Sequence, residues 1–420
     1  MRTFAVVLCS LLVLQAAAQR ECATQAYIKA SRTASQATAA RMDAAERFIK
    51  QKSQSFTSGI LGKASGENSS TIIRIPVVVH VLYNTADQNI SDAQIQSGIA
   101  ALNRDFRRQN SDTVNTPQRF KDLAADMEIE FHLATADSNG ANTTGIIRKQ
   151  TAVPAFTMDD AIKFSAQGGD DAWDSKQYLN IWLGNTRRLL GYATMPGGEA
   201  NIDGVVINCT AFGTINMPAP YNLSRTAVHE TGHWLGLYHI WGDAACGDDM
   251  VDDTPQQGGY TSGCPSGIRT SCGNNATGDM YMNYMDFTND GCMNLFTYGQ
   301  KERMRTLFSS GGPRHSLLTS TGLKEPWTES QTPTEDTVQS HISLNVYPNP
   351  ATQNVTLQFA NTEKEVAGDL YLLNATGSLI EKIRITSGIQ KLNLTKLHAG
   401  VYFLQGTVNG VKVNRKIMKL

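Results

Sequence analysis

The chain lacks a charge imbalance and, beyond its first residues, any long apolar run. It carries 37 Lys plus Arg against 38 Asp plus Glu, so its formal net charge is -1. A nearly neutral composition gives no reason to expect binding to nucleic acid or to an anionic membrane surface. No stretch after the N-terminus approaches the roughly eighteen unbroken apolar residues of a transmembrane helix. We therefore expect no nucleic-acid partner and no membrane span, and we expect a monomer.

Histidine and cysteine are scarce, with 8 and 7 in 420 residues, so any clustering of them is informative. Apolar residues form 41% of the chain, which is enough for each domain to bury a core and excludes disorder of the whole chain. At roughly 150 residues per domain, this length predicts two to three domains.

The N-terminus has the pattern of a secretory signal peptide. Arg2 precedes the apolar run Phe4–Leu14, and small residues follow it. This order predicts cleavage at Ala18 or Gln19, hence a signal peptide over residues 1–19 and a protein secreted through the periplasm.

Composition divides the rest of the chain. Ala-rich residues with helical spacing predict a helical pro-segment over 20–54, and small polar residues predict an exposed linker over 53–70. A stretch rich in Pro, Thr, Glu and Ser predicts a second linker over 324–340. These linkers delimit a central domain over 55–323 and a C-terminal domain over 341–420.

The central domain has a mixed α/β pattern. A capping box at Ser91-Asp92-Ala93-Gln94 predicts a helix that runs to about Arg107, and a second helix is predicted after Ser224, over Thr226–Leu237. Strands are predicted over Ile72–Leu82, Met127–Ala134, Tyr178–Leu183 and Gly204–Thr210.

Short alternating segments predict a small all-β sandwich at the C-terminus. Turn residues at Asn349-Pro350, Ala375-Thr376-Gly377 and Asn409-Gly410 separate them. The predicted strands are Leu344–Tyr347, Asn354–Phe359, Asp369–Leu373, Leu392–Leu394, Val401–Val408 and Val411–Met418.

Three of the histidines fall within eleven residues, in the segment HETGHWLGLYH from His229 to His239. Residues four apart share a helix face, so His229 and His233 can bind one ion. Gly236 can end the helix with a positive φ, which lets His239 supply a third nitrogen. Three protein ligands leave one position open, as in catalytic zinc sites. The alternative is a buried helix whose histidines only hydrogen bond, but a chance match to five specified residues is on the order of one in 10⁴ to 10⁵.

This segment resembles the motif of the metzincin metallopeptidases, whose second mark is a methionine turn beneath the zinc. Met285, in Asn283-Tyr284-Met285-Asp286, fits that turn. Further motifs within residues 72–310 make the chain similar to the pappalysin family. These are Ser91-Asp92 with Leu102-Asn103, Gly191-Tyr192-Ala193, Asp252-Asp253-Thr254-Pro255 and Cys292-Met293 through Phe296-Thr297. The resemblance implies a metzincin-type zinc endopeptidase, made as a latent precursor, that hydrolyses peptide bonds of proteins.

The catalytic chemistry follows from the zinc ion. Zinc lowers the pKa of its bound water toward about 7, and Glu230 takes the proton and passes it to the leaving amine. Relatives usually have Tyr two residues after the turn methionine, whereas this chain has Phe287. Loss of an oxyanion donor can cost on the order of 10²–10³ in turnover, so we expect a slower or differently assisted enzyme.

Two other functions stay open. The protein could be a zinc-bound adhesin, in which Phe287 marks lost catalysis, although such a protein would not need Glu230 beside the metal. It could also be a zinc hydrolase that acts on something other than peptides, which no residue supports.

Six cysteines remain once Cys9 is removed with the signal peptide, and lipidation of Cys9 lacks the small residues that should precede it. Four of them lie within the polar stretch 246–292, which cannot bury much apolar surface, and export favours disulfides there. Spacing alone allows three pairings. The pappalysin resemblance implies the pairs Cys246–Cys272 and Cys264–Cys292.

The other two cysteines are Cys22 and Cys209. A thiolate is a good zinc ligand, so Cys22 in the pro-segment could fill the open zinc position and keep the precursor latent. A Cys22–Cys209 disulfide is the alternative.

Two further roles are implied by the family resemblance. Asp249, Asp253 and Thr254 would bind a calcium ion, for which several oxygen ligands are suitable, unless they belong to a solvated acidic loop. Asp290 matches an aspartate at the base of the pocket for the residue just after the scissile bond. A carboxylate there would favour Arg, or else Lys, because Arg can form two parallel charge-assisted hydrogen bonds. The alternative is that Asp290 caps a turn.

The C-terminal domain resembles the sorting domain of type IX secretion cargo. The matching segments are Val346–Pro350, Leu392–Leu394, Gly400–Tyr402 and the basic end from Lys412 to Lys419. The resemblance implies the type IX secretion machinery as a partner, and a secreted protein that could stay at the cell surface. A generic sandwich that binds carbohydrate or protein is the alternative.

Overall fold

The computed structural model describes residues 22–60, 72–323, 343–360, 366–374, 379–409 and 411–420. The predicted signal peptide and the predicted linker over 324–340 lie outside these residues. The chain divides into two compact units, Met1–Thr328 and Glu329–Leu420, and their boundary falls within that predicted linker. Among the described residues, no helix is both long and apolar enough to cross a bilayer.

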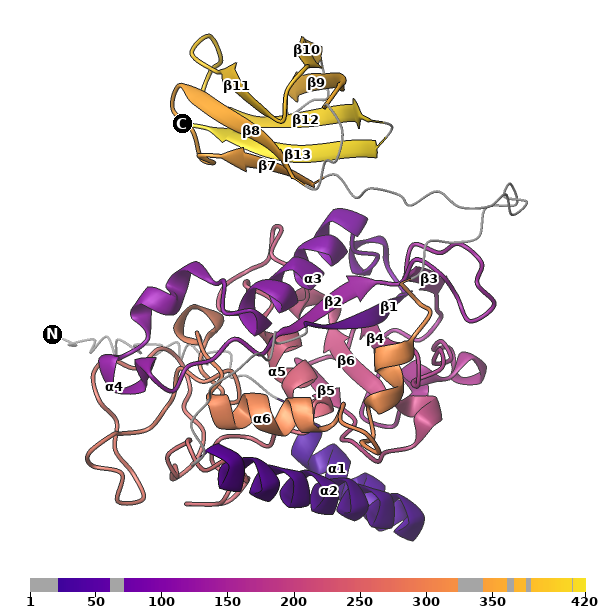
Figure 1. Cartoon of the computed structure of the whole chain (residues 1–420). Helices are drawn as coiled ribbons and strands as arrows, with labels where there is room; N and C mark the ends of the chain where they lie inside the picture. The colour runs from indigo at the N-terminus through magenta and orange to yellow at the C-terminus, as the bar shows by residue number, and fades with distance from the viewer. Residues whose placement is uncertain (1–21, 61–71, 324–342, 361–365, 375–378, 410) are drawn as a thin grey trace, which may run out of the picture. The chain divides into compact units, whose positions relative to one another are not determined.

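The first unit is built on a six-stranded sheet with the order β2-β1-β4-β6-β5, in which β3 also pairs with β1 (Figure 1). All pairs are parallel except β5 with β6. The strands are β1 (Ile73–Tyr83), β2 (Ile129–Leu133), β3 (Ile146–Gln150), β4 (Leu179–Gly184), β5 (Gly191–Ala193) and β6 (Gly204–Asn208). The predicted mixed α/β class is confirmed, while β3 and β5 were not predicted as strands. β5 is too short to have a pattern, and β3 is only partly buried.

Strand β1 lies inside this sheet, between β4 on one side and β2 and β3 on the other, and is buried on both faces. Ile75, Val77 and Val79 join the larger apolar cluster, and Val78 and Leu82 join clusters on the other face. Complete burial of each such side chain stabilises the fold by about 1.5–3 kcal/mol. The continuous β-branched run in the sequence therefore reflects a strand with no solvent-exposed face.

Helices α3 (Asp92–Phe106) and α5 (Arg225–Trp234) pack against each other, and α3 also packs on β2. The Ser91 side chain accepts a hydrogen bond from the Gln94 N–H at 3.2 Å, as predicted for the N-cap. The reciprocal half of the predicted capping box is wrong, because the Gln94 side chain donates to the Phe212 carbonyl at 2.9 Å.

Helix α5 ends at Trp234, earlier than the predicted end at Leu237. Gly236 has a φ of +84°, so the left-handed residue that was expected to end the helix is present. The Leu237 N–H bonds back to the Gly232 carbonyl at 2.9 Å and closes the turn. The predicted end of the helix came too late because apolar residues continue on both sides of Gly236.

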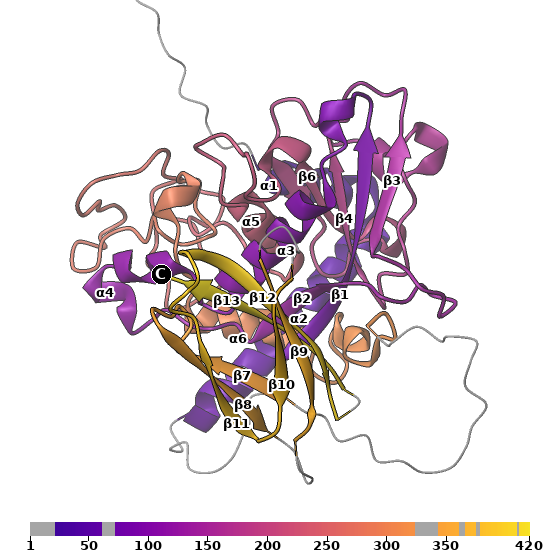
Figure 2. The ribbon, with the colours of Figure 1, turned by 90° about the horizontal axis from the view of Figure 1, so that it is seen from above.

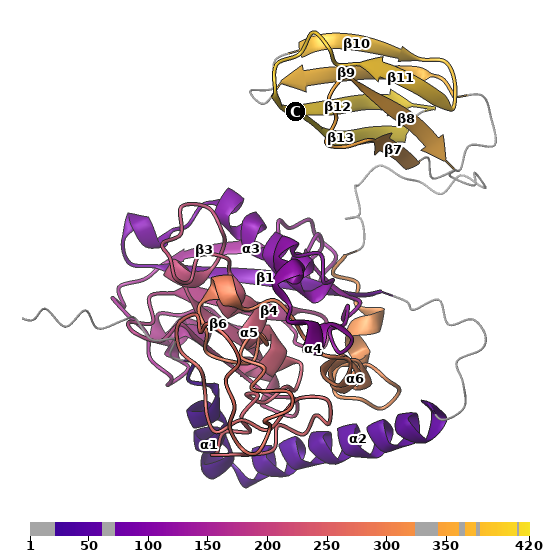
Figure 3. The ribbon, with the colours of Figure 1, turned by 90° about the vertical axis from the view of Figure 1, so that its left-hand side faces the viewer.

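The N-terminal segment forms two helices, α1 (Thr24–Ala34) and α2 (Gln36–Ile60), which lie along one side of the first unit (Figure 3). α1 contacts β5, and α2 contacts α6 (Tyr298–Thr306). Glu46 of α2 forms an ion pair at 2.5 Å with the nearly buried Arg303 of α6. The prediction that the linker begins at Ser53 is wrong, because neither Gly nor Pro interrupts the helix before its last turn.

The C-terminal unit is an all-β sandwich, as predicted (Figure 2). One sheet has the order β10-β9-β12-β13, and the other has the order β11-β8-β7. The strands are β7 (Ser343–Tyr347), β8 (Asn354–Ala360), β9 (Gly368–Asn374), β10 (Leu379–Ile385), β11 (Ile389–Asn393), β12 (Gly400–Val408) and β13 (Val411–Lys419). β10 was not predicted, since it is a largely exposed edge strand with three charged residues. The predicted turn at 375–377 lies outside the described residues.

Candidate active site

Helix α5 and the turn after it bring three imidazoles together. His229 and His233 lie one helical turn apart, and their Nε2 atoms are 3.2 Å apart. The Nε2 of His239 lies 3.1 Å from that of His233. Together with the Cys22 thiol these nitrogens form a cluster whose ligand atoms all lie within 4.8 Å of one another. The three histidines predicted from the motif therefore meet at one point that could hold a metal ion.

The opposite nitrogen of each ring is held by an oxygen acceptor. The Nδ1 of His229 lies 2.7 Å from the Tyr284 carbonyl oxygen, and that of His233 lies 2.8 Å from the Leu237 carbonyl oxygen. The Nδ1 of His239 lies 2.5 Å from Asp243 Oδ1. A proton on Nδ1 satisfies these acceptors and leaves the Nε2 lone pair directed at the cluster. Burial, and next the proximity of His239, hold the pKa of His233 far below its ordinary value. His233 is thus neutral at neutral pH, as a metal ligand must be.

Met285 lies directly beneath the helix that carries the histidines. A Cβ placed on Gly232 would come within 2.6 Å of the Met285 sulfur, so a larger residue here would force the methionine to shift. The turn is held by a bond from the Met285 N–H to Asn283 Oδ1 at 2.9 Å and by one from the Ile240 N–H to the Met285 carbonyl at 3.2 Å. The predicted methionine turn is thus in place under the cluster.

The N-terminal segment enters this site. The Cys22 sulfur lies 3.6 Å from His233 Nε2 and 3.5 Å from Glu230 Oε2. The Thr24 hydroxyl donates to the same Glu230 oxygen at 2.9 Å and accepts from the Ala193 N–H at 2.9 Å. Sequence reasoning placed Cys22 here but missed Thr24, which no motif marks.

The surroundings of the Cys22 thiol change its pKa. Burial, and next the negative charge of Glu230, raise its pKa well above the ordinary value. A dication among the histidines would oppose both effects and favour the thiolate. The alternative disulfide is wrong, because both Cys22 and Cys209 are free and Cys209 lies buried in the core of the sheet unit.

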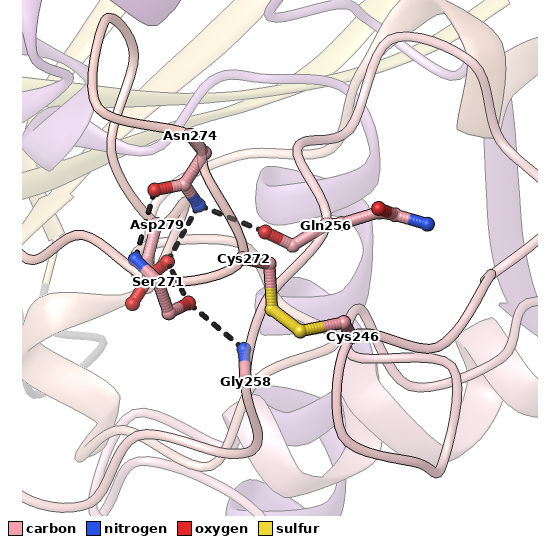
Figure 4. The surroundings of a disulfide bond; sticks show 7 residues. All are labelled: Cys246, Gln256, Gly258, Ser271, Cys272, Asn274 and Asp279. Carbon is pink, nitrogen blue, oxygen red and sulfur yellow. Dashed lines mark hydrogen bonds between the residues drawn. A yellow bond between two sulfur atoms is a disulfide. The ribbon is translucent and has the colours of Figure 1, made fainter.

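Two disulfides shape the long loop between α5 and α6. They join Cys246 to Cys272 and Cys264 to Cys292, as the family resemblance implied. Polar contacts surround the first (Figure 4): the Ser271 hydroxyl donates to Asp279 at 2.6 Å and accepts from the Gly258 N–H at 2.8 Å. Covalent and polar links thus order a loop that has little apolar core.

Aromatic rings form one wall of the site. The Phe287 ring centre lies 4.9 Å from that of His239, 4.8 Å from that of Trp241 and 5.4 Å from that of Tyr260. Phe287 has no hydroxyl to offer at this place. Sequence reasoning missed Trp241 and Tyr260, which the loop fold brings to the site.

The predicted calcium residues are only partly gathered. The Thr254 hydroxyl lies 2.9 Å from both carboxylate oxygens of Asp249. Asp253 instead accepts from the Thr297 hydroxyl at 2.6 Å and the Gly299 N–H at 2.8 Å, at the start of α6. Burial raises the pKa of Asp249 to about 7. Within the described residues, the histidines with Cys22 form the one group of three or more His, Cys, Asp or Glu suited to a metal ion.

Asp290 is buried at the beginning of α5. Its Oδ2 atom accepts from the Leu223 N–H at 2.9 Å and from the Arg225 N–H at 3.2 Å. These are donors at the start of the helix, so Asp290 caps α5 from a distant part of the chain. A capping role had been the alternative for this residue, although at a turn rather than at a helix.

Family models match both units. Residues 164–309 match the peptidase family described as pregnancy-associated plasma protein-A, and residues 345–420 match the secretion system C-terminal sorting domain. An extracellular metalloprotease of Pyricularia oryzae is 32% identical over 250 residues, which cover 56% of this chain and 75% of that protein. Extracellular metalloprotease 1 of Coccidioides posadasii is 47% identical over 227 residues, which cover 45% and 79%.

Solved structures match the first unit. Mirolysin in complex with compound 9 is 53% identical, with a TM-score of 0.58, and covers 59% of this chain and 97% of that one. A promirolysin mutant from Tannerella forsythia is 46% identical, with a TM-score of 0.64, and covers 71% and 97%. The precursor form thus matches more of this chain.

Proposed function

The chain belongs to the pappalysin family and is a secreted metalloprotease, and from this premise we propose that it is a zinc endopeptidase kept latent by its own N-terminal segment. One observation carries the proposal: three imidazoles converge beside Glu230, and the Nδ1 of each lies against an oxygen acceptor. Zinc bonds of about 2.0–2.1 Å in a tetrahedron place neighbouring nitrogens about 3.3 Å apart. The separations of 3.1 and 3.2 Å suit that geometry.

The residues around the cluster support peptide hydrolysis. Zinc, when bound, supplies a polarised carbonyl and a water of lowered pKa. Glu230 is placed to accept the water's proton and to deliver it to the leaving amine. The edge of β5 offers the Ala193 N–H and the Gly191 carbonyl, which Thr24 and Ala23 occupy in the precursor. A peptide substrate can bond to the same two groups as an added strand.

Latency follows from the same contacts. Cys22 would take the fourth zinc position as a thiolate, where the catalytic water is needed. Thr24 holds the Glu230 carboxylate at the same time. The match to a promirolysin structure supports a latent precursor.

Replacement of Glu230 tests the enzyme proposal. The full chain and its Glu230→Ala variant, each after removal of the N-terminal segment, are compared for bound zinc and for casein cleavage. We expect equal, stoichiometric zinc and a loss of at least about 10²–10⁴-fold in cleavage. Stoichiometric zinc with no cleavage by the unmutated protein would contradict the proposal and favour the adhesin.

We further propose that Asp290 confers a preference for Arg, or else Lys, just after the scissile bond. Support comes from its burial beside α5, two residues before Cys292, whose disulfide fixes the segment. Asp290 also caps α5, so the test needs a variant that still accepts hydrogen bonds from the helix. Asp290→Asn does so while it removes the negative charge. Equal cleavage before Arg, Leu and Ala by the unmutated enzyme would contradict this preference, and Asp290→Asn should remove it.

Calcium binding by Asp249, Asp253 and Thr254 stays a prediction. The secreted location rests on the sorting domain and on the extracellular relatives. We propose that export uses the type IX machinery from the periplasm and that the sorting unit is its address.

A further inference from the structure

The N-terminal segment fills a second site besides the metal cluster. Tyr27 of α1 is only 4% exposed, and its ring centre lies 4.8 Å from that of Tyr192 in β5. Asp160, Lys163 and Tyr192 contact this tyrosine, and Trp182 belongs to the same apolar cluster. We call these four residues the tyrosine socket. An N-terminal segment that is removed on activation would uncover this socket.

The socket matches the hydroxyl of the tyrosine as well as its ring. The Tyr27 hydroxyl donates to Asp160 Oδ2 at 2.7 Å and accepts from Lys163 Nζ at 3.2 Å. One oxygen thus meets both an anionic acceptor and a cationic donor. A phenylalanine would fill the aromatic space but leave both charged groups without this partner.

The socket does not depend on Tyr27 for its own structure. Lys163 is fully buried, and its Nζ also contacts Asp160 Oδ1 at 2.9 Å and donates to the Ile202 carbonyl at 2.9 Å. The Tyr192 hydroxyl also donates to Asp160 Oδ1, at 3.3 Å. The Lys163 ammonium lies 5.4 Å and 5.0 Å from the ring centres of Trp182 and Tyr192. These contacts keep the charged pair in place after the N-terminal segment leaves.

The socket shares strand β5 with the catalytic groups but lies on the opposite face of the sheet, because successive side chains of a strand point to opposite faces. Tyr192 stands between Gly191 and Ala193, the residues of β5 whose backbone groups bond to the N-terminal segment. A Cβ on Gly191 would lie 2.8 Å from the Glu230 side chain, so β5 passes beside the catalytic carboxylate. From Cys22 to Tyr27 the chain is mostly helical and advances about 1.5 Å per residue, whereas an extended peptide advances about 3.3 Å. An extended substrate would therefore reach the socket two or three residues from the scissile bond.

We propose that the tyrosine socket is a substrate subsite of the mature enzyme, selective for a tyrosine two or three residues from the scissile bond. This rests on the proposed peptidase function. The N-terminal segment would then occupy the cleft as a substrate does, with Cys22 at the metal position and Tyr27 in a specificity subsite.

The test uses the full chain after limited proteolysis in the predicted linker before β1. Peptides carry Tyr, Phe or Leu at each of the three positions on either side of the cleaved bond. We expect one position at which Tyr exceeds Phe in kcat/KM by about tenfold, with the Leu peptides still cleaved. Cleavage of the Leu peptides with no tyrosine advantage anywhere would overturn the subsite alone. Failure to cleave any peptide would overturn the peptidase function as well.

Variants of the socket make the test specific. Asp160 has a φ of +62°, which Asn tolerates, so Asp160→Asn should fold while removing the anionic acceptor. Lys163→Met keeps the volume and removes the donor. Each should abolish the tyrosine advantage, whereas Asp159→Asn, at the exposed neighbouring residue, should keep both the advantage and the rate on the Leu peptide. A full tyrosine advantage in both socket variants would overturn the proposal.

Discussion

Phe287 packs against the imidazole of His239, at the position where the family resemblance implied a tyrosine. A hydroxyl at this place could donate to the oxyanion as it forms, which a phenyl ring cannot do. We expect Phe287→Tyr to raise kcat at least about tenfold, with KM and bound metal little changed, because such donors act mainly in the transition state. Steady-state kinetics on one peptide decides this, and an unchanged kcat would show that another group already supplies the donor.

Asp249 is a second residue whose replacement should have a measurable effect, here on the pH dependence of stability. Burial raises its pKa from 3.8 to about 7, so its contribution to stability is present in full below about pH 4 and is lost as the pH rises through about 7. We expect the melting temperature in chelator to fall between pH 5 and pH 8. Asp249→Asn should make the stability less dependent on pH. The change in the free energy of unfolding that it removes is at most about 4 kcal/mol. Asp252→Asn, at an exposed neighbour, is the matched control.

The same variants test the calcium prediction. If calcium binds at Asp249 and Thr254, adding it at pH 8 raises the melting temperature of the unmutated protein and not that of Asp249→Asn. An equal response of both proteins would contradict this site.

At the scale of elements, the contact between α5 and the methionine turn depends on one glycine. Helix propensity alone would favour Gly232→Ala by about 1 kcal/mol. The added Cβ would, however, lie 2.6 Å from the Met285 sulfur, and overpacking costs about 1–3 kcal/mol. We expect a lower melting temperature and weaker metal binding. Gly259→Ala, whose Cβ would meet nothing within 4 Å, should change neither, and a stabilised Gly232→Ala would contradict the packing argument.

The elements also show what could be predicted from the sequence. Strand β1 and helix α5 were predictable because local pattern determines them: a β-branched run and a motif with helical spacing. The partners of the histidines were not, since they are carbonyls and a carboxylate from loops whose paths depend on disulfides and turns. The contacts of Thr24 and Tyr27 could not be predicted either, because docking of α1 on β5 joins residues more than 100 positions apart.

At the scale of the whole molecule, we propose that the two units carry separate functions. The metal cluster, Glu230 and the tyrosine socket all lie within the first unit, Met1–Thr328. We therefore expect deletion of residues 341–420 to leave the activity of the purified, activated protein unchanged. The same deletion should leave the protein in the periplasm, which fractionation of cells measures. Loss of intrinsic activity would instead indicate a catalytic or substrate-binding role for the sandwich.

The central claim is that one zinc ion is held by three histidines and closed off by Cys22. Zinc-edge X-ray absorption on the full-length precursor measures this ligand set directly. We predict three nitrogens at about 2.0–2.1 Å and one sulfur at about 2.3 Å, with the sulfur replaced by a light atom after the N-terminal segment is removed. A precursor that binds no zinc, or whose zinc has no sulfur ligand, would contradict the account.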